Sequence, residues 1–153
     1  SFGADAPPVI DGGACSAGLE STIVALRPNG GWQMLRPGPV PLEELLALLG
    51  PEEKSRGATV EAPGQLAKHY SPGKPVLLNC REAAPNSFVI GFGELEGDVN
   101  LSPSGDLAEA AARLYDCLHR AAASASAAIC IAPVPREGMG GAINDRLRRA
   151  ATP

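Results

Sequence analysis

A segment rich in proline and glycine divides this chain and constrains its fold more than any other feature. Residues 51–75 hold four prolines and three glycines and show no apolar periodicity. Proline removes a backbone donor and glycine weakens regular structure, so neither a helix nor a central strand is expected there. A connection of about 25 residues in a compact protein is usually functional or disordered. We therefore predict two structured parts, residues 1–50 and 75–153, joined by a linker over residues 51–74.

The linker carries side chains with unusual chemistry for a connection. Residues 62–75, APGQLAKHYSPGKP, contain one of the two histidines and one of the two tyrosines of the chain. Lys68, His69, Tyr70 and Ser71 offer positive charge, hydrogen-bond donors and an aromatic face. A loop of this kind can close over a site and exclude water. From the residues alone, a lid and a solvated linker stay equally open.

Composition excludes several classes of protein. The 153 residues are 44% hydrophobic and 20% charged, which is typical of a globular protein. A net charge of −4 gives no broad basic surface for nucleic acid. No apolar run reaches the roughly 18 residues of a membrane span. Cys15, Cys80, Cys117 and Cys130 have no C-x-x-C spacing, so we predict no zinc site, reduced thiols and a cytoplasmic location.

The first part is predicted to contain strands and one helix. Residues 7–13, PPVIDGG, have the pattern of a short strand and a turn. Residues 20–36 combine ESTIVAL, the Asn-Gly of RPNGG and WQMLR, and this pattern predicts a β-hairpin. Residues 40–50, VPLEELLALLG, predict a helix with Pro41 in its first turn and Gly50 at its end.

The second part alternates apolar strands with amphipathic segments. The predicted strands are 75–80, 87–93 and 127–135, and the predicted helices are 106–125 and 141–151. Continuous apolar strands that alternate with helices are typical of an α/β layer. We therefore predict a small Rossmann-like α/β domain with a mainly parallel sheet.

Three polar residues of the first part are candidates for binding a ligand. Arg36 ends a predicted strand before the turn at Pro37, and its planar guanidinium fits a phosphate bidentately. Ser21 and Thr22 carry hydroxyls that suit a small polar substrate. Simpler interpretations stay open for all three, namely a solvated arginine and ordinary strand residues.

Two features near the carboxy terminus have weaker functional interpretations. The loop over residues 135–145, PREGMGGAIND, can present backbone N–H groups to an anion at a helix start, although a plain turn explains its glycines. Arg146, Arg148 and Arg149 crowd the last turn of the last helix. The helix dipole accounts for these arginines without a ligand.

Four stretches occur along the chain in an order that resembles a known family. They are VIDGGACSAGLESTIV, MLRPGPVPLEELLALLG, APGQLAKHYSP and GMGGAINDRLRRAA. Together they resemble the long form of the YrdC-type L-threonylcarbamoyladenylate synthases. The resemblance makes residues 1–50 the end of a YrdC-like α/β catalytic domain, residues 51–74 an interdomain linker or lid, and residues 75–153 an accessory domain.

This resemblance implies an activity and roles for particular residues. The family makes threonylcarbamoyl-AMP and pyrophosphate from L-threonine, bicarbonate and ATP with Mg²⁺, and downstream transferase machinery places the threonylcarbamoyl group on tRNA. By resemblance, Ser21 contacts threonine, Arg36 contacts the nucleotide phosphates, and His69, Tyr70 and Ser71 contact ATP from the closed lid. No residue is assigned as catalytic or as a metal ligand, and no stable direct contact with nucleic acid or with a membrane is expected.

The chain also departs from the family pattern. The family's Lys-x-Arg and Ser-x-Asn motifs lie earlier in the catalytic domain and have no counterpart here. We therefore expect a chain that starts within that domain and is inactive by itself. Two alternatives stay open, a module that binds a nucleotide or anion through EGMGG at residues 137–141 and an interaction domain whose hairpin completes another chain.

Overall fold

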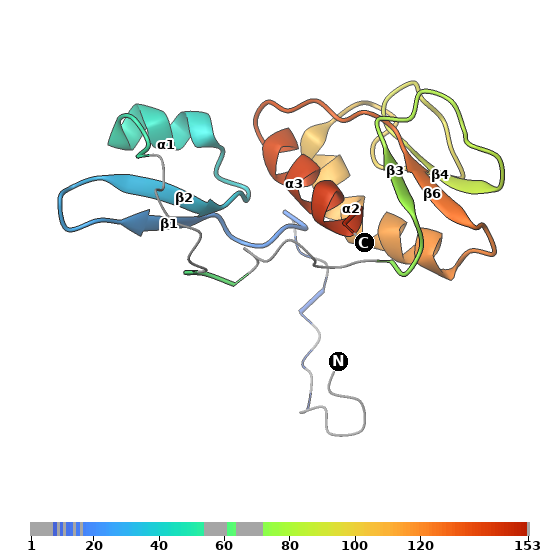
Figure 1. Ribbon diagram of the computed structural model, residues 1–153, viewed down its shortest axis with the longest axis horizontal. Helices are drawn as coiled ribbons and strands as arrows, with labels where there is room; N and C mark the ends of the chain where they lie inside the picture. The colour runs from blue at the N-terminus through green and yellow to red at the C-terminus, as the bar shows by residue number, and fades with distance from the viewer. Residues whose placement is uncertain are drawn as a thin grey trace.

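The computed structural model describes residues 8, 10, 12–13, 15, 17–53, 61–63 and 72–152. It shows a hairpin with one helix beside it, and a separate sheet with two helices (Figure 1). The elements are β1 (Ile23–Leu26), β2 (Trp32–Arg36), α1 (Leu42–Leu49), β3 (Val76–Leu78), β4 (Ser87–Gly91), β5 (Val99–Asn100), α2 (Leu107–Ala123), β6 (Ala128–Ile131) and α3 (Gly140–Ala150).

The predicted hairpin is present. β1 pairs antiparallel with β2, and Leu26 lies opposite Trp32. The Asn-Gly signal falls in the turn between them, where Gly30 has a φ of +84° that glycine adopts without strain. Ser21 and Thr22 lie before β1 and not within it.

The predicted helix over residues 40–50 is also present, as α1. Its C-cap residue is Gly50, whose φ is +79° and whose N–H donates to the Leu46 carbonyl at 3.0 Å. The Trp32 side chain is only 2% exposed, and its indole N–H donates to the Gly50 carbonyl at 3.1 Å. This bond ties the end of α1 to β2.

The strand predicted over residues 7–13 is wrong for the positions that the structure describes. Pro8, Ile10, Gly12 and Gly13 belong to no strand, and Ile10 is 95% exposed. None of these described positions pairs with a strand, so the local pattern is not sufficient to make a strand there.

The second part is a parallel α/β domain, as predicted. Its sheet has the order β3-β6-β4-β5, and every pairing in it is parallel. β5 was not predicted because two residues are too short to show a periodic pattern. The predicted helices appear as α2 and α3. Asp106 is the N-cap residue of α2, and its carboxylate accepts the Glu109 N–H at 2.7 Å.

The two helices cover one face of the sheet and form its core. Alternation along β6 directs Ile129 and Ile131 into the cluster packed under α2 and α3. Cys130 points to the other face, where it is buried and accepts the Ala84 N–H at 3.4 Å. Cys117 is also buried, and all four cysteines carry free thiols.

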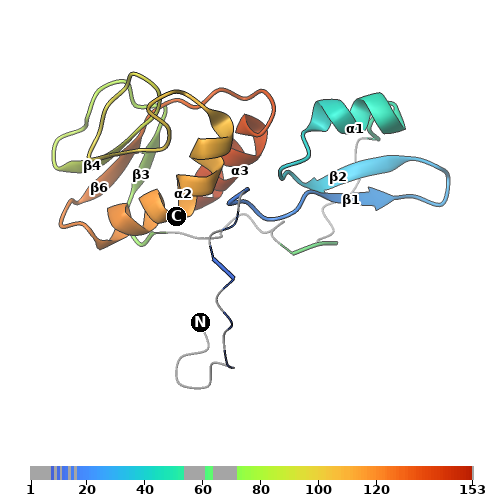
Figure 2. The same ribbon diagram turned by 180° about the vertical axis from the view of Figure 1, so that it is seen from behind.

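The helical layer lies between the sheet and the hairpin, as opposite views show (Figure 1 and Figure 2). The segment before β1 packs directly on α2. At Gly18, with a φ of +61°, an added Cβ would lie 2.3 Å from the Ala112 Cα atom. Such close backbone contact requires glycine, so the hairpin part is docked tightly on the second domain. Within the described residues, no helix is long and apolar enough to cross a membrane.

Candidate functional site

The structure brings Ser21 and Arg36 together. The Arg36 guanidinium donates through Nε to the Ser21 carbonyl at 3.0 Å and through Nη2 to the Ser21 Oγ atom at 3.1 Å. Ser21 is exposed and Arg36 is half-buried. A guanidinium has five N–H donors, and these two contacts use two of them. The pair therefore presents a hydroxyl and a positively charged fork side by side at the surface.

Two local contacts hold this pair in place. The Thr22 hydroxyl donates to the Val40 carbonyl at 3.0 Å and accepts the Val40 N–H at 3.0 Å. Gly38 is buried against the same segment, and an added Cβ there would lie 2.3 Å from the Thr22 backbone nitrogen. The Thr22 hydroxyl thus fixes the chain after Arg36, which gives it a structural role in this site.

A contact from α3 reaches the residues next to the pair. Arg146 donates through Nε to the Glu20 carboxylate at 2.8 Å and through Nη2 to the Pro37 carbonyl at 3.0 Å. The Tyr115 hydroxyl on α2 also donates to Glu20, at 3.0 and 3.1 Å to its two oxygens. The second domain therefore contacts one chain neighbour of each member of the pair, Glu20 beside Ser21 and Pro37 beside Arg36.

The interpretation of Arg146 as a residue explained by the helix dipole is wrong. Its side chain is only 4% exposed, whereas that of Arg148 is 56% exposed. A sequence signal for this burial exists, because Arg146 lies on the stripe of α3 that also carries Ile143, Leu147 and Ala150. A charged residue on an apolar stripe requires a partner, and here the partner is Glu20.

The protonation states of this cluster follow from its contacts. Burial alone would raise the pKa of the Glu20 carboxyl, but its own backbone N–H, Arg146 and the Tyr115 hydroxyl hold that pKa below its ordinary value. Burial and the charge of Glu20 raise the pKa of Tyr115 to about 12. Burial disfavours the charged form of Arg146, yet Glu20 raises its pKa above the ordinary value. At neutral pH the cluster is a carboxylate, a guanidinium and a neutral phenol.

The remaining predicted site residues are not described by the structure. His69, Tyr70 and Ser71 lie outside the described residues. Within the part of the chain that is described, no group of three or more histidine, cysteine, aspartate or glutamate side chains is placed to hold a metal ion.

The Gly-rich loop before α3 has a structural explanation. The Asn144 side-chain amide donates to the carbonyls of Val134, Pro135 and Gly140 at 2.8–3.0 Å. An added Cβ at Gly140 would lie 2.1 Å from the Pro135 carbonyl oxygen. The close turn by itself therefore accounts for the glycine at this position, and anion binding is not needed to explain it.

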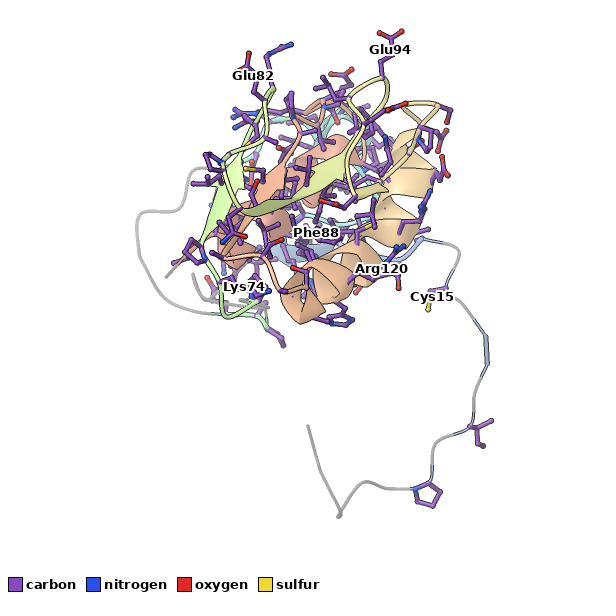
Figure 3. All side chains as sticks on the ribbon, turned by 90° about the vertical axis from the view of Figure 1, so that its right-hand side faces the viewer. Cys15, Lys74, Glu82, Phe88, Glu94 and Arg120 are labelled. Atoms are coloured by element: carbon purple, nitrogen blue, oxygen red, sulfur yellow. The ribbon has the colours of Figure 1, made fainter. Side chains whose placement is uncertain are left out.

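A separate pocket of about 260 Å³ lies against the sheet, away from the hairpin. Its lining includes Cys80, Glu82 and Asp98 from the loops that follow β3 and β4. Figure 3 shows Glu82 and Glu94 pointing outward from these two loops. Because the helical layer separates this pocket from the hairpin, it is not part of the site around Ser21 and Arg36.

Fold and site together define an α/β protein in which a parallel-sheet domain is docked, through a buried arginine, on a hairpin that carries a serine–arginine pair. Residues 40–152 match the family described as threonylcarbamoyl-AMP synthase, C-terminal domain. The chain belongs to this family, and the resemblance stated from the four sequence stretches is confirmed.

Similar proteins agree with this assignment. The chain is 28% identical over 168 residues to a threonylcarbamoyl-AMP synthase from Pyrococcus abyssi, and the match covers 94% of this chain and 48% of that protein. It is 36% identical over 86 residues to a threonylcarbamoyl-AMP synthase from Schizosaccharomyces pombe, with 47% of this chain and 20% of that protein covered.

Solved structures show the same fold. A crystal structure of P. abyssi Sua5 complexed with L-threonine matches with a TM-score of 0.78 and 25% identity, over 98% of this chain and 51% of that chain. A structure of P. abyssi Sua5 with a histidine and the following tyrosine both replaced by alanine matches with a TM-score of 0.69 and 23% identity, over 89% of this chain and 46% of that chain. The present chain thus spans about half the length of the P. abyssi relative.

Proposed function

We propose that this chain is the carboxy-terminal part of a threonylcarbamoyl-AMP synthase. The complete enzyme would form threonylcarbamoyl-AMP and pyrophosphate from L-threonine, bicarbonate and ATP, for the modification of tRNA. Membership of the family and the pairing of Ser21 with Arg36 support this proposal. The related structure that matches 98% of this chain is complexed with L-threonine, which supports threonine as a substrate here.

In this proposal Ser21 and Arg36 contact two different reactants. The Ser21 hydroxyl binds threonine, and the N–H donors of Arg36 that Ser21 does not use bind phosphate oxygens of ATP. Mg²⁺ enters with ATP as part of that substrate. The threonine amine and bicarbonate combine to a carbamate with loss of water. An oxygen of this carbamate attacks the α-phosphorus of ATP, and the bond to the departing pyrophosphate breaks. This chemistry depends on positioning and on neutralising phosphate charge, so a fixed hydroxyl and guanidinium suit it.

The linker would complete the site as a lid. His69, Tyr70 and Ser71 offer donors and an aromatic face to a nucleotide. Pro63 and Pro72 restrict the linker's conformations, which lowers the entropy lost when it orders. Closure of the lid over bound ATP would exclude water from a reactive acyl adenylate.

The activity can be tested by measuring pyrophosphate release that depends on both threonine and bicarbonate. The complete synthase should be active, and the 153-residue chain alone should be inactive, because the resemblance places the Lys-x-Arg and Ser-x-Asn motifs outside it. Robust turnover by the isolated chain would overturn the second expectation. Absence of turnover by the complete protein would overturn the proposed function.

The role of Arg36 can be tested by its replacement with alanine. Loss of a charge-assisted hydrogen bond costs about 1.5–3 kcal/mol, so kcat/KM for ATP should fall by about 10- to 150-fold. Arg148→Ala is the matched control, because it removes an exposed arginine of α3. Equal kinetics of the two variants at limiting ATP would refute the assignment.

The lid can be tested by hydrogen exchange of the complete synthase. Residues 64–73 should exchange more slowly when ATP and threonine are both present, because closure orders them. Tyr70→Ala should lower activity. Identical exchange with and without substrates, together with a fully active Tyr70→Ala variant, would restore the interpretation of a solvated linker.

A further inference from the structure

One buried side chain of the second domain connects the two chain segments that carry the candidate site. Arg146 binds the Glu20 carboxylate at 2.8 Å and the Pro37 carbonyl at 3.0 Å. Glu20 directly precedes Ser21, and Pro37 directly follows Arg36. A single guanidinium therefore contacts the neighbours of both residues in the pair.

We propose that Arg146 is a positioning residue for the Ser21–Arg36 site, and that the second domain acts on the reaction through it. This inference rests on the proposed function. The guanidinium is planar and rigid, so its two acceptors are held at a fixed separation. By fixing the segment at Glu20 relative to the segment at Pro37, Arg146 sets where the Ser21 hydroxyl and the Arg36 fork lie.

The surroundings of Arg146 hold it in one orientation. Its side chain is 4% exposed, and Asp145 accepts from its Nη1 atom at 2.9 Å. Glu20 is oriented in turn by the Tyr115 hydroxyl, whose contacts of 3.0 and 3.1 Å reach both carboxylate oxygens. Because Arg146, Asp145, Tyr115 and Glu20 constrain one another, little freedom remains for the segment before Ser21.

Domain attachment alone does not explain this arrangement. The ion pair joins a buried guanidinium to a Glu20 carboxylate whose side chain is 29% exposed. Neither buried nor exposed ion pairs contribute much net stability compared with apolar packing. Apolar side chains at Glu20 and Arg146 would therefore attach the two parts as well. What they would lack is the directional bond to the Pro37 carbonyl, which fixes the segment after Arg36.

The test is steady-state kinetics of Arg146→Met in the complete synthase. A shift of about 1 Å in reacting groups costs about 100-fold in rate. We expect kcat/KM to fall by about 10- to 100-fold and the KM for threonine to rise. Arg146→Lys keeps the positive charge and one donor nitrogen, so it should recover part of the loss. Arg148→Met removes the same charge from the exposed side of α3 and should leave kinetics unchanged.

A purely structural role predicts a different outcome. It would lower the amount of folded enzyme, and therefore the apparent kcat, without changing the KM for threonine. That result, or equal kinetics of Arg146→Met and Arg148→Met, would overturn the inference. Should Arg146→Met fail to fold, Glu20→Gln provides the same readout, because it removes the charge that Arg146 binds and keeps the shape.

A second measurement does not depend on activity. Hydrogen exchange at residues 20–23 and 36–40 should accelerate in Arg146→Met and stay unchanged in Arg148→Met. Unchanged exchange in both variants would overturn the inference even if the wild-type protein makes threonylcarbamoyl-AMP. Conversely, accelerated exchange in a protein that forms no threonylcarbamoyl-AMP would support the positioning contact and refute the proposed function.

Discussion

Gly38→Ala tests how closely the backbone packs behind the Ser21–Arg36 pair. An added Cβ at Gly38 would lie 2.3 Å from the Thr22 nitrogen, 2.6 Å from the Glu20 carbonyl oxygen and 2.7 Å from the Ser21 carbonyl carbon. All three atoms belong to backbone, which cannot rotate away as a side chain can. Ordinary contact begins at 3.4 Å, so the two segments must separate by about 1.1 Å, the difference between 3.4 and 2.3 Å.

This displacement has a structural and a functional cost. Overpacking of this kind destabilises by about 1–3 kcal/mol, which corresponds to a loss of about 2–12 °C in Tm for a protein of at least this size. Because the separating segments carry Ser21 and Arg36, kcat/KM should fall by about 100-fold. Thermal unfolding and pyrophosphate release by the complete synthase would measure the two effects.

Gly141→Ala is the matched control. Its added Cβ would lie 3.4 Å from the Arg136 carbonyl oxygen, which is ordinary contact, and the site is helical. Alanine there should stabilise by about 0.5–1 kcal/mol and leave kinetics unchanged. If Gly38→Ala behaves like this control in both Tm and kcat/KM, the argument from close backbone packing is wrong.

Three further predictions concern the second domain and the thiols. Leu114 is fully buried in the core, so Leu114→Ala should lower the free energy of unfolding by about 2–5 kcal/mol in urea titrations, and a loss below 1 kcal/mol would contradict the assigned core. The pKa of Tyr115 is raised to about 12 in the folded protein, so its contribution to stability is present below its ordinary pKa of 10 and is lost as pH rises from 10 to 12. Tyr115→Phe should remove that part of the alkaline fall in unfolding free energy, and an equally steep fall in the variant would disprove the assignment. Cys15 is exposed, whereas burial raises the pKa of Cys117, so mass spectrometry after brief alkylation should find Cys15 modified first and Cys117 only after unfolding.

Local patterns were sufficient for the regular elements. Each correct prediction used a signal that lies within a few neighbouring residues. These signals are the Asn29–Gly30 turn, the leucine stripe before Gly50 and the apolar runs before and after α2. They were sufficient to predict the hairpin, α1, three strands of the sheet and its two helices. β5 was missed because its two residues carry no strand signal of their own. It is a strand because it pairs with β4. The strand expected over residues 7–13 was wrong at the described positions 8, 10, 12 and 13, because a strand-like pattern supplies no partner.

The site depended on contacts that no local pattern contains. Arg146 and Glu20 are 126 residues apart, so their ion pair follows only from how the two domains dock. The family resemblance assigned Ser21 and Arg36, but it provided no reason to connect them to α3. The available signal was the position of Arg146 on the apolar stripe of α3. This position indicates that Arg146 is buried, but it does not identify Glu20 as its partner.

The strand order has a consequence for how the protein is made. β6 is the last strand of the chain, yet it lies between β3 and β4 and is the strand that β3 pairs with. Val76 of β3 is in register with Ile129 of β6, a separation of 53 residues (129 minus 76). During synthesis β3 and β4 emerge first and leave between them a gap that residues 128–131 must later fill. Such non-local pairing is slow compared with helix formation. The amino-terminal hairpin is therefore expected to form while this sheet is still incomplete, and α3 can dock on it only after translation has passed β6.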